Sequence, residues 1–476
     1  MNAILDALRR HADRAPKRIA LIGDDMRLTY GQLVDLVDVW AGRLDRETRG
    51  PIALAIDNGP AWAVLDLAAL AAGIPCVPVP SFFTPDQVAH VLDSAGVGLV
   101  ITDRPEGEGA FPVDIAGSQA WLRARRAPPP DLGPDVAKIT FTSGTTGTPK
   151  GVLLTAATLD HVARSLARVT AASARDHHLA VLPLATLLEN VAGIYAPLLV
   201  GAATVLPGMR SVGLSGSSDL DPERLARALV DHRATTAILL PAMLGALIVV
   251  SRGRPPGFDH LRFLAVGGAP VAAALLREAE TLGLPVFQGY GLSECGSVVA
   301  VNAPGANRLG SVGRPLPHLA VELAADGEIL IAGDRFGGYL GDRRAVAQGP
   351  FASGDIGRFD DDGFLYVDGR KKDIFITGFG RNISPAWVEN ALMAHAAIGQ
   401  AAVFGEGSAA AIAVIVAAAD RDAVAAAVAE TNRGLPDYAR VGRWVVAATP
   451  FTPANGLAAP GGSVRRAAIR AAYHIE

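Results

Sequence analysis

The chain has 476 residues, half of them hydrophobic, which at roughly 150 residues per domain allows about three domain-sized units with buried cores. Its 43 basic and 47 acidic residues give a net charge of −4, and no run of five or six basic residues occurs, so we expect neither nucleic acid nor a membrane surface as a partner. Two cysteines, Cys76 and Cys295, occur without any CxxC pair, which excludes a disulfide framework and a structural zinc site.

The first ten residues mix acidic and basic side chains and contain no apolar segment followed by a cleavage site. We therefore expect no export signal and a cytoplasmic location. The longest apolar stretch, residues 191–206, contains Gly and Pro and is shorter than the roughly 20 residues that a membrane-spanning helix needs. It is typical of a buried core segment.

The first 130 residues alternate helical and strand-like patterns. Helices are predicted at residues 4–12, 33–44 and 62–72, and strands at 19–22, 52–56 and 76–79. Such alternation predicts an α/β fold with parallel pairing. A Pro-rich connector follows at 126–131, and the alternation then resumes with strands at 237–240 and 263–266. The pattern predicts two similar α/β subdomains in one large body.

Beyond residue 310 the predicted strands become shorter and turn signals more frequent, with strands at 327–332 and 364–367 around a turn at 360–363. This pattern of short strands and frequent turns predicts a small β-rich subdomain. The Ala-rich remainder mixes helices with strands at 411–416 and 444–447, which is enough for a separate small α+β domain. We place the boundary after Lys372, so that the predicted domains are 1–372 and 373–476.

The segment 142–151, TSGTTGTPKG, follows a strand-like stretch and combines glycines with hydroxyl side chains. Small residues let backbone N–H groups approach phosphate oxygens, hydroxyls add donors, and Lys150 supplies a positive charge. The loop is not a Walker loop, because Pro149 stands where the GxxxxGK[ST] pattern requires Gly. The segment predicts a phosphate-binding loop of another kind.

This segment resembles the phosphate-binding signature of the adenylate-forming superfamily, which includes acyl- and aryl-CoA synthetases, peptide-synthetase adenylation domains and luciferases. Four further segments resemble other signatures of that superfamily in the same order: RLTYG at 27–31, GYGLSEC at 289–295, SGD at 353–355, and GRKKDI at 369–374 with GRNISP at 380–385. The resemblance extends over nearly the whole chain. It implies a large N-terminal domain followed by a mobile C-terminal domain.

The resemblance also implies an enzyme that uses ATP and Mg²⁺ in two steps. A carboxylate attacks the α-phosphorus of ATP to give acyl-AMP and pyrophosphate, and the pantetheine thiol of coenzyme A or of an acyl carrier protein then displaces AMP. An amino acid substrate is disfavoured, because Leu187 stands near the place where amino-acid-activating relatives have Asp. With Thr186 in place of the His of many CoA ligases, the local pattern favours a fatty or small aryl acid.

Site roles follow from the resemblance position by position. The catalytic candidates are Thr146, Lys150, Glu294 as the Mg²⁺ ligand, Arg465 and Arg466. The nucleotide-binding candidates are Thr142, Ser143, Gly144, Thr145, Thr146, Gly147, Lys150, Gly267, Gly268, Gly289, Tyr290, Gly291, Ser293, Asp355 and Arg370. Lys372 is the expected hinge, and Gly378 and Gly380 belong to the expected pantetheine loop. The chemistry is suitable, since Tyr290 offers an aromatic face to adenine and Asp355 can accept from both ribose hydroxyls.

The chain departs from the superfamily near its C-terminus. Relatives carry a catalytic Lys there in a GKxxR-like sequence, but this chain has Ser463 at that position and no Lys after residue 372. Only Arg465 or Arg466 could supply the charge from this loop, and Arg is not equivalent to Lys. The alternative is a degenerate member that binds a nucleotide or acyl-adenylate without turnover. The role of Glu189 also has two alternatives: it is either a pocket residue or an interior carboxylate that accepts hydrogen bonds from backbone donors.

Overall fold

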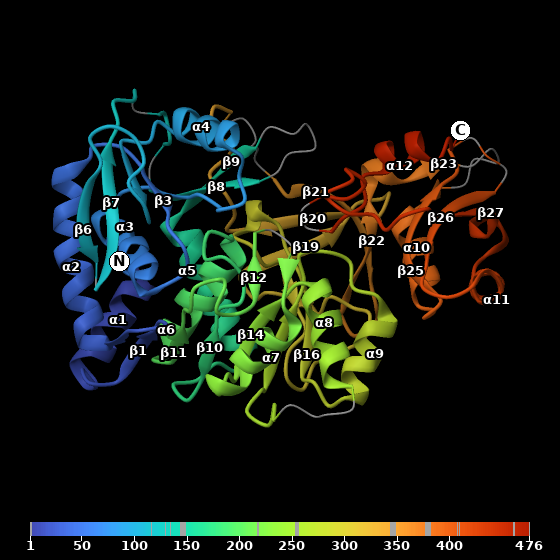
Figure 1. Ribbon diagram of the computed structural model, residues 1–476, viewed down its shortest axis with the longest axis horizontal. Helices are drawn as coiled ribbons and strands as arrows, with labels where there is room; N and C mark the ends of the chain where they lie inside the picture. The colour runs from blue at the N-terminus through green and yellow to red at the C-terminus, as the bar shows by residue number, and fades with distance from the viewer. Residues whose placement is uncertain are drawn as a thin grey trace.

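The computed structural model describes residues 2–115, 117–128, 130–133, 135–142, 149–216, 219–252, 257–342, 349–376, 382–406, 408, 410–459 and 462–475. Most of the chain forms one large body, and the segment coloured orange to red forms a smaller unit beside it (Figure 1). The predicted fold class is confirmed: the large part is α/β with two major sheets, and a β-rich subdomain and an α+β C-terminal unit follow.

The two major sheets are built from strands that are far apart in sequence. One has seven described strands, in the spatial order β6 (Phe111–Ile115), β7 (Ser118–Ala124), β5 (Leu99–Thr102), β3 (Ile52–Ala55), β4 (Cys76–Pro78), β8 (Val136–Thr142) and β9 (Lys150–Thr155). The other has nine described strands, β18 (Arg314–Pro315), β17 (Ala300–Val301), β16 (Val286–Tyr290), β15 (Phe263–Val266), β14 (Thr236–Leu239), β10 (His177–Leu179), β11 (Ala203–Val205), β1 (Ile19–Ile22) and β2 (Arg27–Thr29).

The two sheets correct the predicted division at the Pro-rich connector. Strands β1 and β2 precede the connector but belong to the nine-stranded sheet, where β1 pairs in parallel with β11. Strands β8 and β9 follow the connector but belong to the seven-stranded sheet, where β8 pairs with β4. Hydrophobic periodicity indicates the type of an element and carries no information on its partner, so the exchange of strands was not visible in the sequence.

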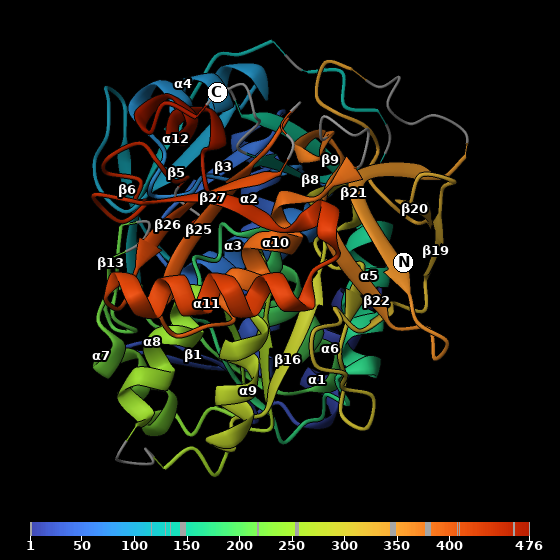
Figure 2. The same cartoon turned by 90° about the vertical axis from the view of Figure 1, so that its right-hand side faces the viewer.

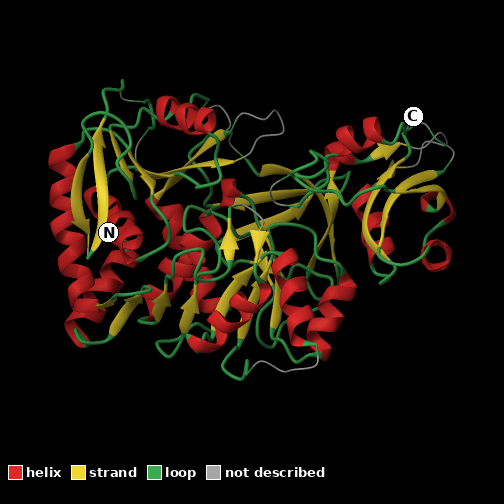
Figure 3. Cartoon of the chain, viewed as in Figure 1, coloured by secondary structure: helices red, strands yellow, loops and turns green. Residues whose placement is uncertain are grey.

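Two smaller sheets follow along the chain. The β-rich subdomain is an antiparallel sheet of β19 (Leu319–Leu323), β20 (Glu328–Gly333), β21 (Phe351–Phe359) and β22 (Leu365–Arg370). The C-terminal sheet contains β25 (Ile398–Phe404), β26 (Ala411–Ala417) and β27 (Val441–Val446), with helices packed around it (Figures 2 and 3). Short two-stranded pairs join β12 (Leu214–Ser215) to β13 (Asp219–Leu220) and β23 (Phe375–Ile376) to β24 (Asn382–Ile383).

The described α-helices are α1 (Ala3–Arg14), α2 (Tyr30–Glu47), α3 (Pro60–Ala72), α4 (Pro85–Ser94), α5 (Ala156–Val169), α6 (Ala196–Val200), α7 (Pro222–Asp231), α8 (Pro241–Ser251), α9 (Ala273–Thr281), α10 (Pro385–Met393), α11 (Arg421–Gly434) and α12 (Arg466–Ala472). A π-helix, η1 (Glu189–Tyr195), and the short 3₁₀-helices η2 (Ser293–Cys295), η4 (Lys371–Asp373) and η5 (Asp437–Ala439) complete the set. None of the helices in the described part of the chain is long and apolar enough to cross a bilayer.

Local sequence explains where the N-terminal helices begin and which face they bury. Thr29 caps α2 in a reciprocal capping box with Gln32, and Thr84 caps α4 in the same way with Gln87. Helix α2 then buries residues at helical spacing, whereas α3 is apolar nearly all round. Accordingly, α3 lies in the largest core cluster, which also contains side chains from both major sheets.

The predicted apolar core segment 191–206 begins inside the π-helix η1, which the sequence did not indicate. A π-helix forms i→i+5 backbone hydrogen bonds in place of the i→i+4 bonds of an α-helix, so its turns are wider and residues five apart lie near one face. Asn190 and Tyr195 are five apart, and both donate to Asp66 Oδ2, at 2.9 Å from Asn190 Nδ2 and 2.5 Å from the Tyr195 hydroxyl. The wide turn therefore delivers two donors to one buried carboxylate.

That carboxylate is paired with a buried lysine. Lys138, in β8, places its Nζ 2.5 Å from Asp66 Oδ1, and each side chain is only 1% exposed. The ammonium also lies 5.6 Å from the ring centroid of Trp62 and 5.7 Å from that of Tyr195, within cation–π range. The Lys138 ammonium and the Asp66 carboxylate thus both have partners. A buried ion pair is tolerated under this condition.

Asp66→Ala is expected to lower the free energy of unfolding by about 4 kcal/mol, because the Lys138 ammonium would stay buried without its carboxylate. The matched control is Asp38→Ala, which removes an exposed ion pair with Arg9 whose two side chains are each 55% exposed. A change of about 0–1 kcal/mol is expected there. Chemical denaturation measures both, and equal losses in the two variants would contradict the structural role given to Asp66.

Candidate active site

A cavity of about 490 Å³ lies between the nine-stranded sheet and the helices α5, η1 and α6. Residues from the predicted nucleotide set line one end of it: Thr142, Gly267, Gly268, Gly289, Tyr290, Gly291 and Ser293. They come from β8, from the end of β16, from the loops that follow β15 and β16, and from η2. The structure therefore brings together segments that are separated by more than a hundred residues.

The glycines at this end allow close approach of backbone segments. A Cβ atom at position 291 would lie 1.7 Å from the carbonyl oxygen of Ser297, which no side chain tolerates. Gly268 has a φ of +79°, in the left-handed region that favours glycine. Backbone groups can thus border the cavity where side chains would fill it, which suits a flat nucleotide base and its phosphates.

Asp355, the predicted ribose contact, touches Tyr290 and Arg370, which are two further members of the predicted nucleotide set. The Tyr290 hydroxyl donates to Asp355 Oδ2 at 2.5 Å, and Arg370 Nε lies 2.7 Å from Asp355 Oδ1. Asp355 and Arg370 are pairing partners in β21 and β22, and Asp355 is 3% exposed. Burial raises the pKa of Asp355 and the nearby Arg370 charge opposes that rise, while burial, followed by the Asp355 charge, raises the pKa of Tyr290.

Glu294, the predicted Mg²⁺ ligand, is oriented by a residue that the sequence did not suggest. The Tyr339 hydroxyl donates to Glu294 Oε1 at 2.7 Å, and the Phe336 backbone N–H donates to the Glu294 carbonyl at 2.7 Å. Burial, followed by the hydrogen bond to Glu294, raises the pKa of Tyr339, so this tyrosine keeps its proton as a donor. A fixed carboxylate with oxygen ligands to offer fits Mg²⁺, which proteins commonly hold with one or two carboxylates and substrate phosphates.

The two ends of the predicted phosphate loop are placed side by side. Thr142 and Lys150 are pairing partners at the ends of β8 and β9, and Lys150 is exposed. The segment 337–340 bonds along β9, with Leu340 N donating to Gly151 O and Leu153 N donating to Gly338 O, which connects this strand to Tyr339 and Glu294. The candidates between the two strands, Ser143, Gly144, Thr145, Thr146 and Gly147, lie outside the described residues.

The rest of the cavity is mainly apolar. Thr186 and Leu187 line it, as do Phe82 and Phe83. Glu189 does not line it. Its Oε2 accepts from the Leu182 N–H at 3.0 Å and its Oε1 lies 2.8 Å from His178 Nε2, so the open question is settled in favour of an interior carboxylate, with a histidine as an additional partner.

The C-terminal candidates lie in the smaller unit and differ in their surroundings. Arg466 forms a two-point ion pair with Glu389, with Nη1 to Oε1 at 2.5 Å and Nη2 to Oε2 at 2.8 Å, and the Val403 N–H also donates to Glu389. Arg465, Ser463 and the expected hinge residue Lys372 are exposed. Gly378 and Gly380 lie outside the described residues. The geometry therefore favours Arg465 over Arg466 as a cation that could reach a ligand.

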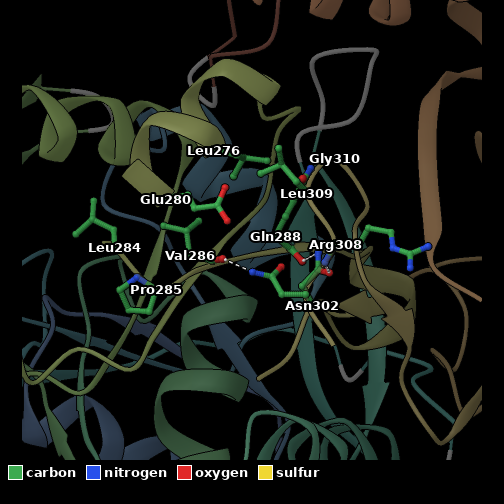
Figure 4. A pocket seen from close by; sticks show the side chains of 11 residues that line it. Leu276, Glu280, Leu284, Pro285, Val286, Gln288, Asn302, Arg308, Leu309 and Gly310 are labelled. Carbon is green, nitrogen blue, oxygen red and sulfur yellow. Dashed lines mark hydrogen bonds between the residues drawn. The ribbon is translucent and has the colours of Figure 1, made fainter. Parts of the chain in front are cut away.

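A second, smaller cavity of about 230 Å³ lies beside α9, at the opposite end of β16 from Tyr290 (Figure 4). None of the predicted site residues lines it. Arg308 borders this cavity, but its guanidinium points away and lies 2.6 Å from carboxylates of Asp360 and Asp362. The smaller cavity thus takes no part in the candidate site.

Family models match most of the chain in two segments. Residues 8–340 match the AMP-binding enzyme model, and residues 372–476 match the AMP-binding enzyme C-terminal domain model.

Individual relatives are similar over most of their length. The chain is 32% identical to a 2-succinylbenzoate–CoA ligase from Bacillus licheniformis over 84% of this chain and 86% of that protein. It is 31% identical to a long-chain-fatty-acid–CoA ligase from Mycobacterium bovis over 72% of this chain and 69% of that protein. The crystal structure of the anthranilate CoA ligase AuaEII in complex with anthranoyl-AMP has the same fold, with a TM-score of 0.81, 18% identity and coverage of 99% and 97%.

The two C-terminal arginines should behave differently when replaced. Arg466→Ala is expected to lower the free energy of unfolding by about 3 kcal/mol, because Glu389, whose side chain is 7% exposed, would lose its partner. The neighbouring Arg465→Ala is the control, and an exposed side chain should change stability by no more than about 0.5 kcal/mol. Chemical denaturation measures both values. A stable Arg466→Ala variant would show that the ion pair does not hold the C-terminal unit together.

Proposed function

The chain belongs to the AMP-binding enzyme family, and from this premise we propose that it is an AMP-forming ligase that joins a fatty or small aryl acid to the thiol of coenzyme A. The resemblance read from the sequence motifs is confirmed by the match over residues 8–340. The relatives named above act, by their names, on 2-succinylbenzoate and long-chain fatty acids, and both are carboxylic acids joined to CoA.

The observation that carries the proposal is the composition of the large cavity. One end is bordered by the glycines and Tyr290 of the predicted nucleotide set, and the remainder is bordered by apolar side chains such as Phe82 and Leu187. An acid whose apolar body fills the second part would present its carboxylate to the nucleotide at the first. This arrangement supplies the proximity that a reaction between two bound substrates requires.

The charged residues of the site suit the first step. Attack of a carboxylate on a phosphate brings negative charges together, so cations and donors must face the place where charge develops. Lys150 and the hydroxyl-rich loop that ends at it would supply donors, and Asp355 would hold the ribose. Glu294 would hold Mg²⁺, which neutralises phosphate charge when bound.

The second step requires the thiol to reach the acyl-AMP. We assign a hinge at Lys372, with 1–372 and 373–476 as the two bodies that move relative to one another. Lys372 is exposed, whereas its neighbour Lys371 lies 2.7 Å from Asp326 and 2.6 Å from Glu328. Coenzyme A is the proposed acceptor, a carrier protein is the alternative acceptor that the same assay tests, and a cytoplasmic location is part of the proposal.

The alternative of a protein that binds a nucleotide without turnover is not favoured. Relatives that match most of the chain are ligases by name, and this chain keeps Lys150, Glu294 and Asp355. The departure at Ser463 concerns one charge of several around the reacting phosphate. Its loss would slow the first step without removing the substrate sites.

Lys150→Ala is expected to lower the rate of acyl-AMP formation about 10²-fold, because one charged donor at a developing anion contributes roughly that factor. Lys17→Ala, which removes another exposed lysine far from the motif, should leave the rate unchanged. ATP–pyrophosphate exchange over a panel of fatty, aryl and amino acids measures the rates, with CoA and a carrier protein compared as acceptors for the second step. If no acid supports exchange in the unmodified protein, the proposed function is wrong.

Lys372→Pro is expected to separate the two steps. Proline fixes φ and removes the torsional freedom of a hinge, so acyl-AMP should still form while thioester formation falls at least about tenfold. Lys372→Ala removes the same side chain but keeps the backbone free, and it should leave both steps near the original rates. Pyrophosphate release and thioester yield measure the steps separately, and an equal loss in both would exclude a hinge at this position.

A further inference from the structure

The apolar part of the large cavity extends along whole strands. Thr236, Ile238 and Leu240 of β14 and its continuation line it together with Ala237, and so do Phe263, Ala265 and Gly267 of β15 and its continuation together with Val266. Alternate residues of a strand point to one face, and four steps of about 3.3 Å give a length of roughly 13 Å. The cavity therefore runs from the nucleotide end to the opposite edge of the sheet.

The wall that faces these strands is formed by helices. Leu166 and Thr170 come from the end of α5 and the residue after it, Ala192 from η1, and Ala196 from α6. Small side chains on η1 and α6 leave the space between helices and sheet open. We call this passage, bounded by the strand residues above and these helical residues, the acyl tunnel.

An ion pair closes the far end of the acyl tunnel. Arg262, just before β15, places Nε 2.6 Å from Asp176 Oδ1 and Nη2 2.6 Å from Asp176 Oδ2, and its Nη1 donates to the Thr170 carbonyl at 2.8 Å. Both residues line the cavity, and the Arg262 side chain is 31% exposed while that of Asp176 is 6% exposed. The pair thus stands between the cavity and solvent.

The polar groups at this end are already satisfied within the protein. The Asp176 carboxylate also accepts from the Thr235 hydroxyl at 2.9 Å and from the Ser173 N–H at 2.7 Å. His178 is held between Thr236, at 2.9 Å, and the carboxylate of Glu189. Among the described lining residues, the cations are therefore neutralised, and the tunnel offers no matching partner to a second carboxylate on the substrate.

We infer that the Arg262–Asp176 ion pair is the floor of the acyl tunnel, that it sets the longest apolar tail the enzyme accepts, and that the substrates are monocarboxylic acids with an extended apolar tail. The inference rests on the proposed function, since it concerns the acid that this site activates. An acid whose tail fills the tunnel gains the free energy of burying each methylene group up to the floor. A longer tail must displace the ion pair, or the substrate carboxylate cannot reach the nucleotide.

Replacement of the floor tests the inference. In the unmodified enzyme, kcat/KM for a series of straight-chain acids from hexanoic to palmitic acid should rise with length and then fall sharply. Arg262→Ala opens the floor and should raise kcat/KM about tenfold for acids just beyond that limit, because two further buried methylene groups contribute about this factor. Acids well below the limit should change little.

Two further variants control for loss of structure. Arg252→Ala removes an exposed ion pair with Glu278 at 2.6 Å, outside the cavity, and should leave the length profile unchanged. Ala192→Phe fills the middle of the tunnel and should move the limit to shorter acids. It also tests the tunnel if Arg262→Ala does not fold.

Three results would overturn the inference. A uniform loss for all acids in Arg262→Ala would show that the ion pair is only structural, and an unchanged limit in Ala192→Phe would show that the tail lies elsewhere. A preference of the unmodified enzyme for 2-succinylbenzoate, which carries a second carboxylate, over monocarboxylic acids of similar length would exclude the substrate class. Failure of the proposed function itself is distinguishable, since no acid would then support pyrophosphate exchange.

Discussion

The buried ammonium of Lys138 is the constraint on which the rest of the molecule depends. An unpaired charge of this kind would cost several kcal/mol, so Asp66 of α3 must stay in contact with it, and two side chains of η1 must stay in contact with Asp66. Helix α3, strand β8 and the π-helix η1 are distant in sequence, and these contacts fix their positions relative to one another. Strand β8, which carries Lys138, ends at Thr142 where the predicted phosphate loop begins, and η1 supplies Ala192 to the proposed acyl tunnel. One charge cluster thus fixes the predicted nucleotide end of the cavity relative to its apolar wall.

The two carboxylates of the candidate site are each oriented by a tyrosine hydroxyl. Tyr290 donates to Asp355, and Tyr339 donates to Glu294. A neutral hydroxyl fixes the direction of a carboxylate without neutralising it. Asp355 also lies 2.7 Å from Arg370 Nε, and this ion pair offsets part of its charge. Burial raises the pKa of both tyrosines, which keeps them protonated as donors. The site therefore orders its acidic groups before a substrate arrives.

Local signals explain which parts of the molecule the sequence could predict. The phosphate loop and the segment from Gly289 to Cys295 are contiguous motifs, and strands such as β1 and β15 follow directly from apolar runs. Contacts between distant residues carry no such signal. The pairing of Glu189 with His178, the donor Tyr339 for Glu294, and the exchange of strands between the two major sheets all depend on tertiary packing. The π-helix was also missed, because its i→i+5 hydrogen-bond spacing leaves no distinct hydrophobic pattern over so short a segment.

The few lysines of the chain limit which cation could replace the lysine that relatives have at the position of Ser463. The chain has lysine at only five positions, and two of them are committed to ion pairs: Lys138 with Asp66, and Lys371 with acidic residues of the β-rich subdomain. Arg466 is likewise paired with Glu389, so its charge is not available to a ligand. What is left at the C-terminal loop is an exposed guanidinium at Arg465, which is planar, strongly basic and suited to two-point contact with a carboxylate or phosphate. If the reaction uses a cation from this loop, that cation is therefore the guanidinium of Arg465. Its geometry differs from that of a lysine, because it presents several N–H donors in one plane, and the site must accommodate these in place of a single ammonium.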